Sequence, residues 1–367
     1  MKIRRAYKTK LKTNNAEAAL FRQCAGVARY VFNWALADRE KRYKAGLKTG
    51  LEQKTRFNAI KDEIAPWVRD YPYTIQESAF INLDRAFKNF YRRVKNGDAK
   101  KGFPKFKSKR RSKRSFTVRG VTIERGRIHL PTMGWFQLAE RGYLPTGRFN
   151  GNAVTISETA GEWFVSIQVE VEIPNRSGHD GDLGIDLGIK TLATCSDGTV
   201  FENPKAIYRY EAKLKRLQRE LARRKKGGKN WLKTKAKIAR LHAKIARVRA
   251  HAAHDASHHV TAVVLPERIV LEDLNVAGMT KNHHLARAVS DASMSELGRQ
   301  ITYKALWNGV EVEKADRWFP SSKTCSRCGC IKDDLTLADR TFVCDDCGLV
   351  IDRDLNAAKN LAAYKPR

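Results

Sequence analysis

The chain has 367 residues, of which 42% are hydrophobic, so it can bury sizeable cores and is not a disordered polycation. Lys and Arg number 71 against 39 Asp and Glu, which leaves a net charge of +32. A charge of this size repels itself unless a polyanion neutralises it, and because no lipid motif or amphipathic anchor is visible, nucleic acid is the expected partner rather than a membrane.

The chain is expected to be cytoplasmic. Its first residues, M-K-I-R-R-A-Y-K, lack the apolar core of a signal peptide, and apolar runs such as 260–265 are too short to span a bilayer. Four of the seven cysteines form C-x-x-C pairs, which suits zinc in a reducing compartment better than disulfides.

The N-terminal half is predicted to combine strands with a helical insert. Residues 3–12 alternate basic and apolar side chains, as a strand does, whereas residues 15–95 show helical spacing that Pro66 and Pro72 interrupt. Residues 115–173 alternate again and contain glycine turns. This pattern predicts a small barrel or curled sheet that the N-terminal strand completes.

A basic segment, residues 95–114, joins the predicted helices to the strands. Its simplest interpretation is a solvated, flexible run of charges. However, Phe103 and Phe106 lie within it, and cations that hold phosphate beside rings that stack on bases favour a folded nucleic-acid contact. The candidate nucleic-acid-binding residues are Lys105, Lys107, Lys109, Arg110, Arg111, Lys113 and Arg114.

From residue 182 the pattern becomes α/β. A buried strand over 183–189 is followed by two more strands joined at Asp197-Gly198, which predicts three adjacent antiparallel strands. Two long amphipathic helices with basic outer faces follow, joined by a turn at 226–229; they form either a solubilising hairpin or a surface that tracks phosphates. The remaining predicted elements are a strand at 268–272, a helix around 293–308, a strand at 310–315 and a helix at 355–363.

Three acidic residues lie at the ends of these elements. Asp186 lies in G-I-D-L-G-I-K, Glu272 in I-V-L-E-D-L-N and Asp354 in D-R-D-L-N-A-A-K-N-L. This order matches a ribonuclease-H-like fold, in which the first and fourth strands are neighbours and the last helix packs beside them. Carboxylates that meet there can hold two Mg²⁺ ions about 3.5–4 Å apart and hydrolyse a phosphodiester. Any one of these acids alone is more simply a solvated or capping residue, so the prediction rests on all three occurring in this order.

Two neighbouring acids compete for these roles. Asp273 follows Glu272, but alternation along a strand places their side chains on opposite faces. Asp352 competes with Asp354; we favour Asp354 because it immediately precedes the predicted helix, and the sequence leaves the choice open.

A second metal site is predicted at Cys325, Cys328, Cys344 and Cys347. The two C-x-x-C pairs are fifteen residues apart, as in zinc ribbons, and four thiolates close a tetrahedral structural site. A redox role is the weaker alternative because a dithiol needs only one pair. Cys330 adds a third local sulfur.

With these residues identified, the chain resembles the TnpB (OrfB) family of transposon-encoded, RNA-guided DNA nucleases, which are relatives of the type V CRISPR effectors. The stretches that carry the resemblance are G-I-D-L-G-I-K-T-L-A, V-L-E-D-L-N-V-A-G-M, R-W-F-P-S-S-K-T-C-S-R-C-G, C-G-L-V-I-D-R-D-L-N-A-A-K-N-L, N-L-D-R-A-F-K-N-F-Y-R-R and F-P-K-F-K-S-K-R-R. The fold implied is a multidomain α/β protein. Its parts would be a β-barrel wedge domain (1–14 and 110–178), a helical recognition domain (15–109), an RNase H-like (RuvC) nuclease domain (179–320 and 350–367) and an inserted zinc ribbon (321–349).

The resemblance also implies an activity and its partners. Asp186, Glu272 and Asp354 would be the RuvC acids that bind Mg²⁺, and the four cysteines would bind structural Zn²⁺. A guide RNA from the transposon end would pair with double-stranded target DNA beside a short motif, and a monomer with one RuvC site would cut it. Two alternatives remain: a catalytically inactive RNA-guided regulator, against which the intact triad argues, and an RNA-independent DNA transposase.

Overall fold

A computed structural model describes residues 2–47, 52–173, 179–336 and 339–366. The chain divides into two compact units, one of Arg4–Val171 and one of Met1–Ile3 with Glu172–Arg367. The predicted domain boundary between residues 178 and 179 lies outside the described residues. Within the described ranges, no helix has the length and apolar character needed to cross a membrane.

The strands of the first unit form one sheet with the order β2-β7-β8-β1-β5-β4-β3-β6 among the described residues. β1 (Lys2–Lys12) lies between β8 and β5, so the N-terminal strand joins strands that follow the helices, as predicted. The others are β2 (Ser115–Val118), β3 (Val121–Glu124), β4 (Arg127–Leu130), β5 (Gly134–Leu138), β6 (Gly147–Phe149), β7 (Val154–Thr159) and β8 (Glu162–Glu172).

The predicted helical region consists of α1 (Asn15–Lys44), α2 (Gln53–Ile64) and α3 (Tyr73–Lys95). α1 begins at a capping box in which Asn14 and Glu17 each accept a hydrogen bond from the other's backbone N–H at 2.8 Å. Pro66 begins the short 3₁₀ helix η1 (Pro66–Asp70), and Pro72 precedes α3. Both predicted breaks are therefore confirmed, because proline cannot continue a helix that precedes it.

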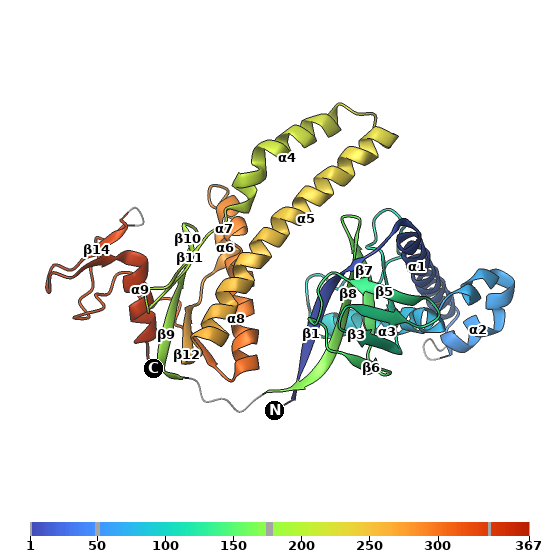
Figure 1. Ribbon diagram of the computed structural model, residues 1–367, viewed down its shortest axis with the longest axis horizontal. Helices are drawn as coiled ribbons and strands as arrows, with labels where there is room; N and C mark the ends of the chain where they lie inside the picture. The colour runs from blue at the N-terminus through green and yellow to red at the C-terminus, as the bar shows by residue number, and fades with distance from the viewer. Residues whose placement is uncertain (1, 48–51, 174–178, 337–338, 367) are drawn as a thin grey trace. The chain divides into compact units, whose positions relative to one another are not determined.

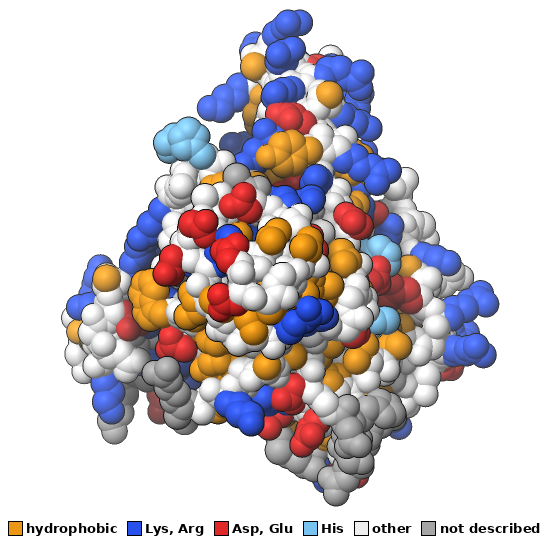
Figure 2. Space-filling model, turned by 90° about the vertical axis from the view of Figure 1, so that its left-hand side faces the viewer, with side chains coloured by type: hydrophobic (Ala, Val, Ile, Leu, Met, Phe, Trp, Pro, Cys, Tyr) orange, Lys and Arg blue, Asp and Glu red, His pale blue; other side chains and the backbone are white. Residues whose placement is uncertain are grey.

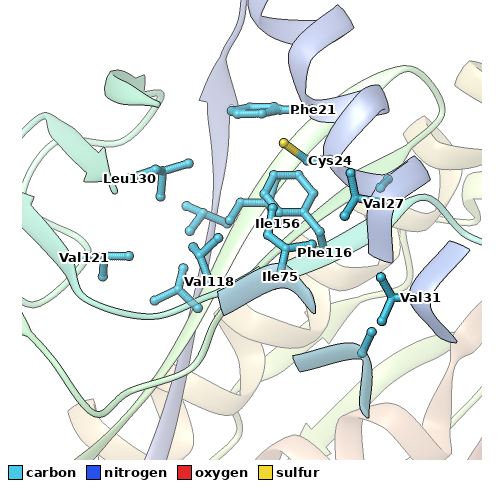
Figure 3. Close-up of a cluster of buried hydrophobic side chains, with 14 of the residues drawn as sticks. Phe21, Cys24, Val27, Val31, Ile75, Phe116, Val118, Val121, Leu130 and Ile156 are labelled. Atoms are coloured by element: carbon cyan, nitrogen blue, oxygen red, sulfur yellow. The ribbon is translucent and has the colours of Figure 1, made fainter. Parts of the chain in front are cut away.

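A single buried core joins these helices to the sheet (Figure 3). Phe21 of α1 packs against Phe116 of β2 and Trp163 of β8, with ring centroids 5.6 and 5.3 Å away. Each fully buried apolar side chain of this kind contributes about 1.5–3 kcal/mol. The helical insert is thus held on the sheet by apolar burial.

The second unit contains a five-stranded sheet, with the order β11-β10-β9-β12-β13 among the described residues (Figure 1). β9 (His179–Leu187), β10 (Thr191–Cys195) and β11 (Val200–Glu202) are antiparallel neighbours, as predicted. β12 (Pro266–Glu272) runs parallel to both β9 and β13 (Glu311–Ala315). The first and fourth strands of this unit are therefore neighbours, which is the arrangement predicted from the order of elements.

Helices flank this sheet and extend beyond it. α4 (Ala206–Ala222) and α5 (Lys229–His258) form the predicted hairpin, and α5 continues into the π-helical turn η2 (His259–Val263). The others are α6 (Val276–Met279), α7 (Ala286–Ala292), α8 (Met294–Asn308) and α9 (Arg353–Ala362). Figure 2 shows Lys and Arg side chains crowded over the far end of the hairpin, at the top of the view.

A buried acid anchors the base of the hairpin. Asp291 of α7 is 2% exposed and accepts hydrogen bonds from Ile207 N at 3.0 Å and Arg249 Nε at 2.8 Å. Its carboxylate therefore caps the start of α4 and pairs with a cation of α5 at once. Such a charge is tolerated inside a protein because it is both paired and hydrogen-bonded.

Candidate active site and zinc centre

Asp186 and Glu272 are placed at one edge of the sheet by the pairing of β9 with β12. The strands are parallel, with Leu271 opposite Ile185, so the next residue of each strand is an acid at the same C-terminal edge. Ile185 and Leu271 are buried and hold the strands in register. Neighbouring apolar strands thus deliver two carboxylates to one place.

The third acid comes from α9, which lies directly on β9. A methyl group added at Gly184 would lie 1.9 Å from Ala358 O and 2.4 Å from Ala362 N, so only glycine permits this approach. α9 begins at Arg353, two residues earlier than predicted, and this places Asp354 inside the first turn.

Asp352, and not Asp354, caps this helix. Asp352 Oδ1 accepts hydrogen bonds from the backbone N–H of Asp354 at 2.9 Å and of Leu355 at 3.1 Å. The carboxylate of Asp352 is therefore committed to the helix terminus. Asp354 contacts Arg353 Nη2 at 3.3 Å and raises the pKa of Asp186 more than Asp352 does.

The electrostatics of Asp186 indicate that Glu272 and Asp354 lie near it. Burial, followed by the negative charges of Glu272 and Asp354, raises the pKa of Asp186 to about 8, and the nearby Arg353 guanidinium only partly opposes this. The donor set consists of carboxylate oxygens, which are the ligands preferred by hard divalent cations such as Mg²⁺. A cation would relieve the repulsion that otherwise keeps a proton on Asp186.

The acids are spread more widely than the ligands of a single ion. Among residues whose positions are described, only four cysteines bring three or more ligand atoms within 4.8 Å of one another. A pair of ions about 3.5–4 Å apart requires a wider ring of ligands than one ion does. The three carboxylates therefore do not form a compact single-ion ligand group in this structure.

Glu272 and Asp273 point to different partners, as alternation along the strand predicts. The buried Ser321 hydroxyl donates a hydrogen bond to Glu272 Oε1. Asp273 instead pairs with Arg317 and, at 3.6 Å, with Lys314. Ser321 was not identified from the sequence, because a serine in F-P-S-S-K carries no local sign of the carboxylate that it meets.

Two buried asparagines of α9 connect the acids to the cysteine cluster. Asn360 Nδ2 donates to Ser321 O at 2.7 Å and to Thr324 O at 2.6 Å. Asn356 Nδ2 donates to Thr324 O at 2.7 Å, and its Oδ1 accepts from Ser326 N at 3.0 Å. We name these contacts the asparagine latch. Its sequence signal is two asparagines four residues apart in L-N-A-A-K-N-L, on a helix face that is otherwise apolar.

The asparagine latch binds the backbone on both sides of Cys325, at Thr324 and Ser326. Cys325 is the first of the four clustered cysteines. Sγ atoms of Cys325 and Cys347 lie 3.6 Å apart, and those of Cys328 and Cys344 lie 3.5 Å apart. Tetrahedral Zn²⁺ with Zn–S bonds of 2.3 Å needs sulfurs about 3.8 Å apart, so the cluster fits zinc. The fifth local sulfur, on Cys330, is not part of this group.

The predicted nucleic-acid-binding segment is irregular and packs partly on the helices. Lys107 lies with Nζ 3.8 Å from the ring centroid of Phe32, and its burial lowers its pKa. Arg114 pairs with Glu158 at 2.6 Å. These two cations have partners within the protein, whereas the other candidates are exposed: Lys105, Lys109, Arg110, Arg111 and Lys113.

Comparison with known families gives matches along the chain. A family described as "Probable transposase" (OrfB_IS605) matches residues 166–283, "Cas12f1-like, TNB domain" matches 295–361, and "Helix-turn-helix domain" matches 1–48. In the structure, this last stretch contains β1 and α1.

Individual proteins match over nearly their whole length. One from Streptomyces pristinaespiralis, named "Putative RNA-guided DNA endonuclease", is 33% identical over 98% of this chain and 89% of its own. InsQ of Escherichia coli (strain K12), which has the same description, is 33% identical over 99% and 92%. The solved structure of the mini-RNA-guided endonuclease CRISPR-Cas_phi3 covers 98% of this chain and 92% of its own, with a TM-score of 0.51 at 10% identity, which indicates a shared fold.

Proposed function

The chain belongs to the TnpB (OrfB) family, and on that premise we propose that it is an RNA-guided, Mg²⁺-dependent DNA endonuclease with a single RuvC-like site. The observation that carries the proposal is the convergence of Asp186, Glu272 and Asp354 at one edge of the sheet. Carboxylates that repel one another beside apolar strands weaken the protein unless they bind cations, so the arrangement favours a catalytic metal site.

The side chains at this site have distinct tasks in the proposed reaction. Two bound Mg²⁺ ions would supply an activated water and neutralise charge on the departing 3′ oxygen. Asp186, Glu272 and Asp354 would hold the ions, Ser321 donates a hydrogen bond to Glu272 and would orient it, and the first turn of α9 carries Asp354. The zinc ribbon has a structural task, because four thiolates leave no position open for substrate.

We further propose the domains and partners that the family suggests. Residues 1–14 and 110–178 would form a β-barrel wedge domain, and 15–109 a helical recognition domain. Residues 179–320 and 350–367 would form the RuvC-like domain, with the zinc ribbon at 321–349. The exposed cations of the basic segment and the α4–α5 hairpin would hold the backbones of guide RNA and target DNA, while base pairing supplies the specificity.

The test begins with the protein purified together with its RNA. That RNA is sequenced, and plasmids carrying a matching target are incubated with the complex and Mg²⁺. Asp186→Ala should lower the cleavage rate at least about a thousandfold and leave DNA binding in Ca²⁺ unchanged, because only the metal site is altered. Glu267→Ala is the matched control, since that exposed acid lies at the opposite end of β12 from Glu272, and it should cut normally. Undiminished cutting by Asp186→Ala would refute the site assignment.

A second candidate, an RNA-independent transposase, is favoured by the description "Probable transposase" of the matching family. The two functions differ in their need for RNA. Digesting the copurified RNA should abolish site-specific cutting by a guided nuclease, whereas specific DNA joining by RNA-free protein would establish the transposase.

A further inference from the structure

A cavity of about 270 Å³ opens beside Glu272, between α8 and the ends of β9, β12 and β13. The buried lining residues Leu187 and Leu271 make an apolar floor, and Leu274, Val276, Ser295 and Thr302 line it as well. The cavity meets the acid cluster at Glu272, at the end of β12, whereas Leu187 and Leu271 alternate with Asp186 and Glu272 and pack toward α8.

Gly298 of α8 keeps this cavity open. Glycine is the least favourable residue apart from proline inside a helix, so its presence in the middle of α8 calls for a reason. The backbone supplies none, because Gly298 has no positive φ. Close packing supplies none either, since an added Cβ would meet no atom within 4 Å. The missing side chain instead leaves open space where Gly298 lines the cavity.

Two cations stand where the cavity meets solvent. The Arg299 guanidinium is held by Glu296 on the same helix, at 2.7 and 2.9 Å. Lys314 Nζ lies 3.6 Å from Asp273. Both side chains are well exposed. Each can therefore contact a phosphate at the opening of the cavity, above the apolar side chains that line it.

An apolar floor beneath a cationic rim matches the chemistry of a nucleotide. The ring faces of a base are apolar and every base has them, whereas its phosphate is anionic and stays at the surface. A volume of about 270 Å³ is just under the common range of small-ligand sites, about 300–1,000 Å³, which allows one nucleotide but not a base pair.

We propose that this cavity is a subsite for one unpaired nucleotide of the strand being cut, next to the phosphate held at Glu272. The proposal rests on the nuclease function proposed above and adds the part of the substrate that the protein itself grips. Holding the neighbouring nucleotide would orient the scissile phosphate between the acids, which is how binding energy remote from the reacting bond accelerates a reaction.

The test fills the cavity from Gly298. Gly298→Leu places a side chain in open space on a helix, so the variant should melt at or above the temperature of the parent protein. It should slow cleavage of the RNA-matched target about tenfold or more, with target binding in Ca²⁺ retained. Gly298→Ala should slow cleavage less, because a methyl group fills less of the cavity. Leu306→Ala, on the same helix and outside the cavity, is the control and should cut at the parental rate.

A second measurement identifies the occupant. Targets are made with one abasic residue at each successive position around the measured cut. An abasic residue at one of these positions should slow cleavage by the parent protein about tenfold. The same abasic residue should not slow cleavage by Gly298→Leu any further, since both changes remove the same contact. Equal abasic profiles in the two proteins, or full activity of Gly298→Leu, would overturn the subsite. A parent protein that cuts no target would instead remove the proposed function, so the two failures are distinct.

Discussion

The proposed metal-binding role of Asp186 lowers the stability of the metal-free folded protein. It is delivered to the sheet edge by an apolar strand, and its surroundings favour the neutral form, with a pKa of about 8. An ordinary aspartate ionises near pH 3.9. Between these values the folded protein binds a proton that the unfolded chain has released, so stability falls as the pH rises through this window.

We therefore expect Asp186→Asn to stabilise the metal-free protein. The gain should be small at pH 4, grow through neutral pH, and reach on the order of 1–3 kcal/mol above pH 8, because the amide cannot ionise. Melting temperatures across this pH range with EDTA measure it. Mg²⁺ should raise the melting temperature of the parent protein and not of the variant. If the difference in melting temperature between Asp186→Asn and the parent protein did not depend on pH, the raised pKa of Asp186 would be contradicted.

Gly184 is the second residue on which the site depends. It lies two positions before Asp186, where the backbone of α9 touches β9. The contact allows Asp354 to approach Asp186, and it requires the absence of a side chain rather than an unusual backbone conformation, since Gly184 has no positive φ.

Gly184→Ala should accordingly move α9 away from the sheet. Overpacking of this kind costs about 1–3 kcal/mol, and the displaced Asp354 should reduce cleavage further than the stability loss explains. Urea denaturation and cleavage rates measure the two effects. Gly151→Ala is a suitable control, because its added methyl group meets nothing within 4 Å. A fully active and fully stable Gly184→Ala protein would show that the helix does not approach so closely.

At the scale of elements, α9 connects the proposed carboxylate metal site with the cysteine cluster. Its first turn carries Asp354, and the asparagine latch grips the residues on either side of Cys325. The same latch holds Ser321, which contacts Glu272. The cysteine cluster is thus connected through α9 and Ser321 to Glu272 and Asp354, two of the acids that we propose as catalytic, although it lies between them in the sequence.

Asn360→Ala tests this coupling. The change removes the side-chain donor to Ser321 O and leaves Thr324 O with the hydrogen bond from Asn356, at a cost of about 1–3 kcal/mol. Zinc content should remain at one ion per chain, while the Mg²⁺ concentration for half-maximal cleavage should rise about tenfold, as for other residues that orient metal ligands. Lys359→Ala, the exposed neighbour on α9, should change neither quantity. Loss of zinc without any change in Mg²⁺ dependence would separate the two sites.

For the whole molecule, the excess of positive charge is the dominant property. The tip of the α4–α5 hairpin concentrates exposed cations, among them Lys225, Lys226 and Lys229 (Figure 2). Contacts from such cations to phosphates release counterions, so binding weakens as salt rises.

Replacing these three lysines with glutamine should lower the salt dependence of nucleic-acid binding. Each lost phosphate contact should reduce the slope of log K against log salt by about 0.9 on duplex DNA, for every sequence alike. Anisotropy titrations of a labelled duplex between 50 and 200 mM NaCl measure this slope. An unchanged slope would mean that the hairpin is a solubilising surface.

The sequence by itself determined the order and type of most elements and the cysteine cluster, and it predicted a polyanionic partner. Helical and strand periodicity, turn residues such as Asp197-Gly198, and C-x-x-C spacing are local properties, which short stretches of chain express without the rest of the fold. Charge is a sum over residues and needs no fold at all. The pairing of the first with the fourth strand followed from the order of the elements.

Only the tertiary structure decided the contacts between distant segments. It put Asp352 on the helix cap, paired Asp273 with Arg317, set Ser321 against Glu272, and left a cavity at Gly298. The physical reason is that a hydrogen bond or a cavity depends on which atoms meet within a few ångströms. Side chains far apart in the sequence reveal their partners only when packing brings them together.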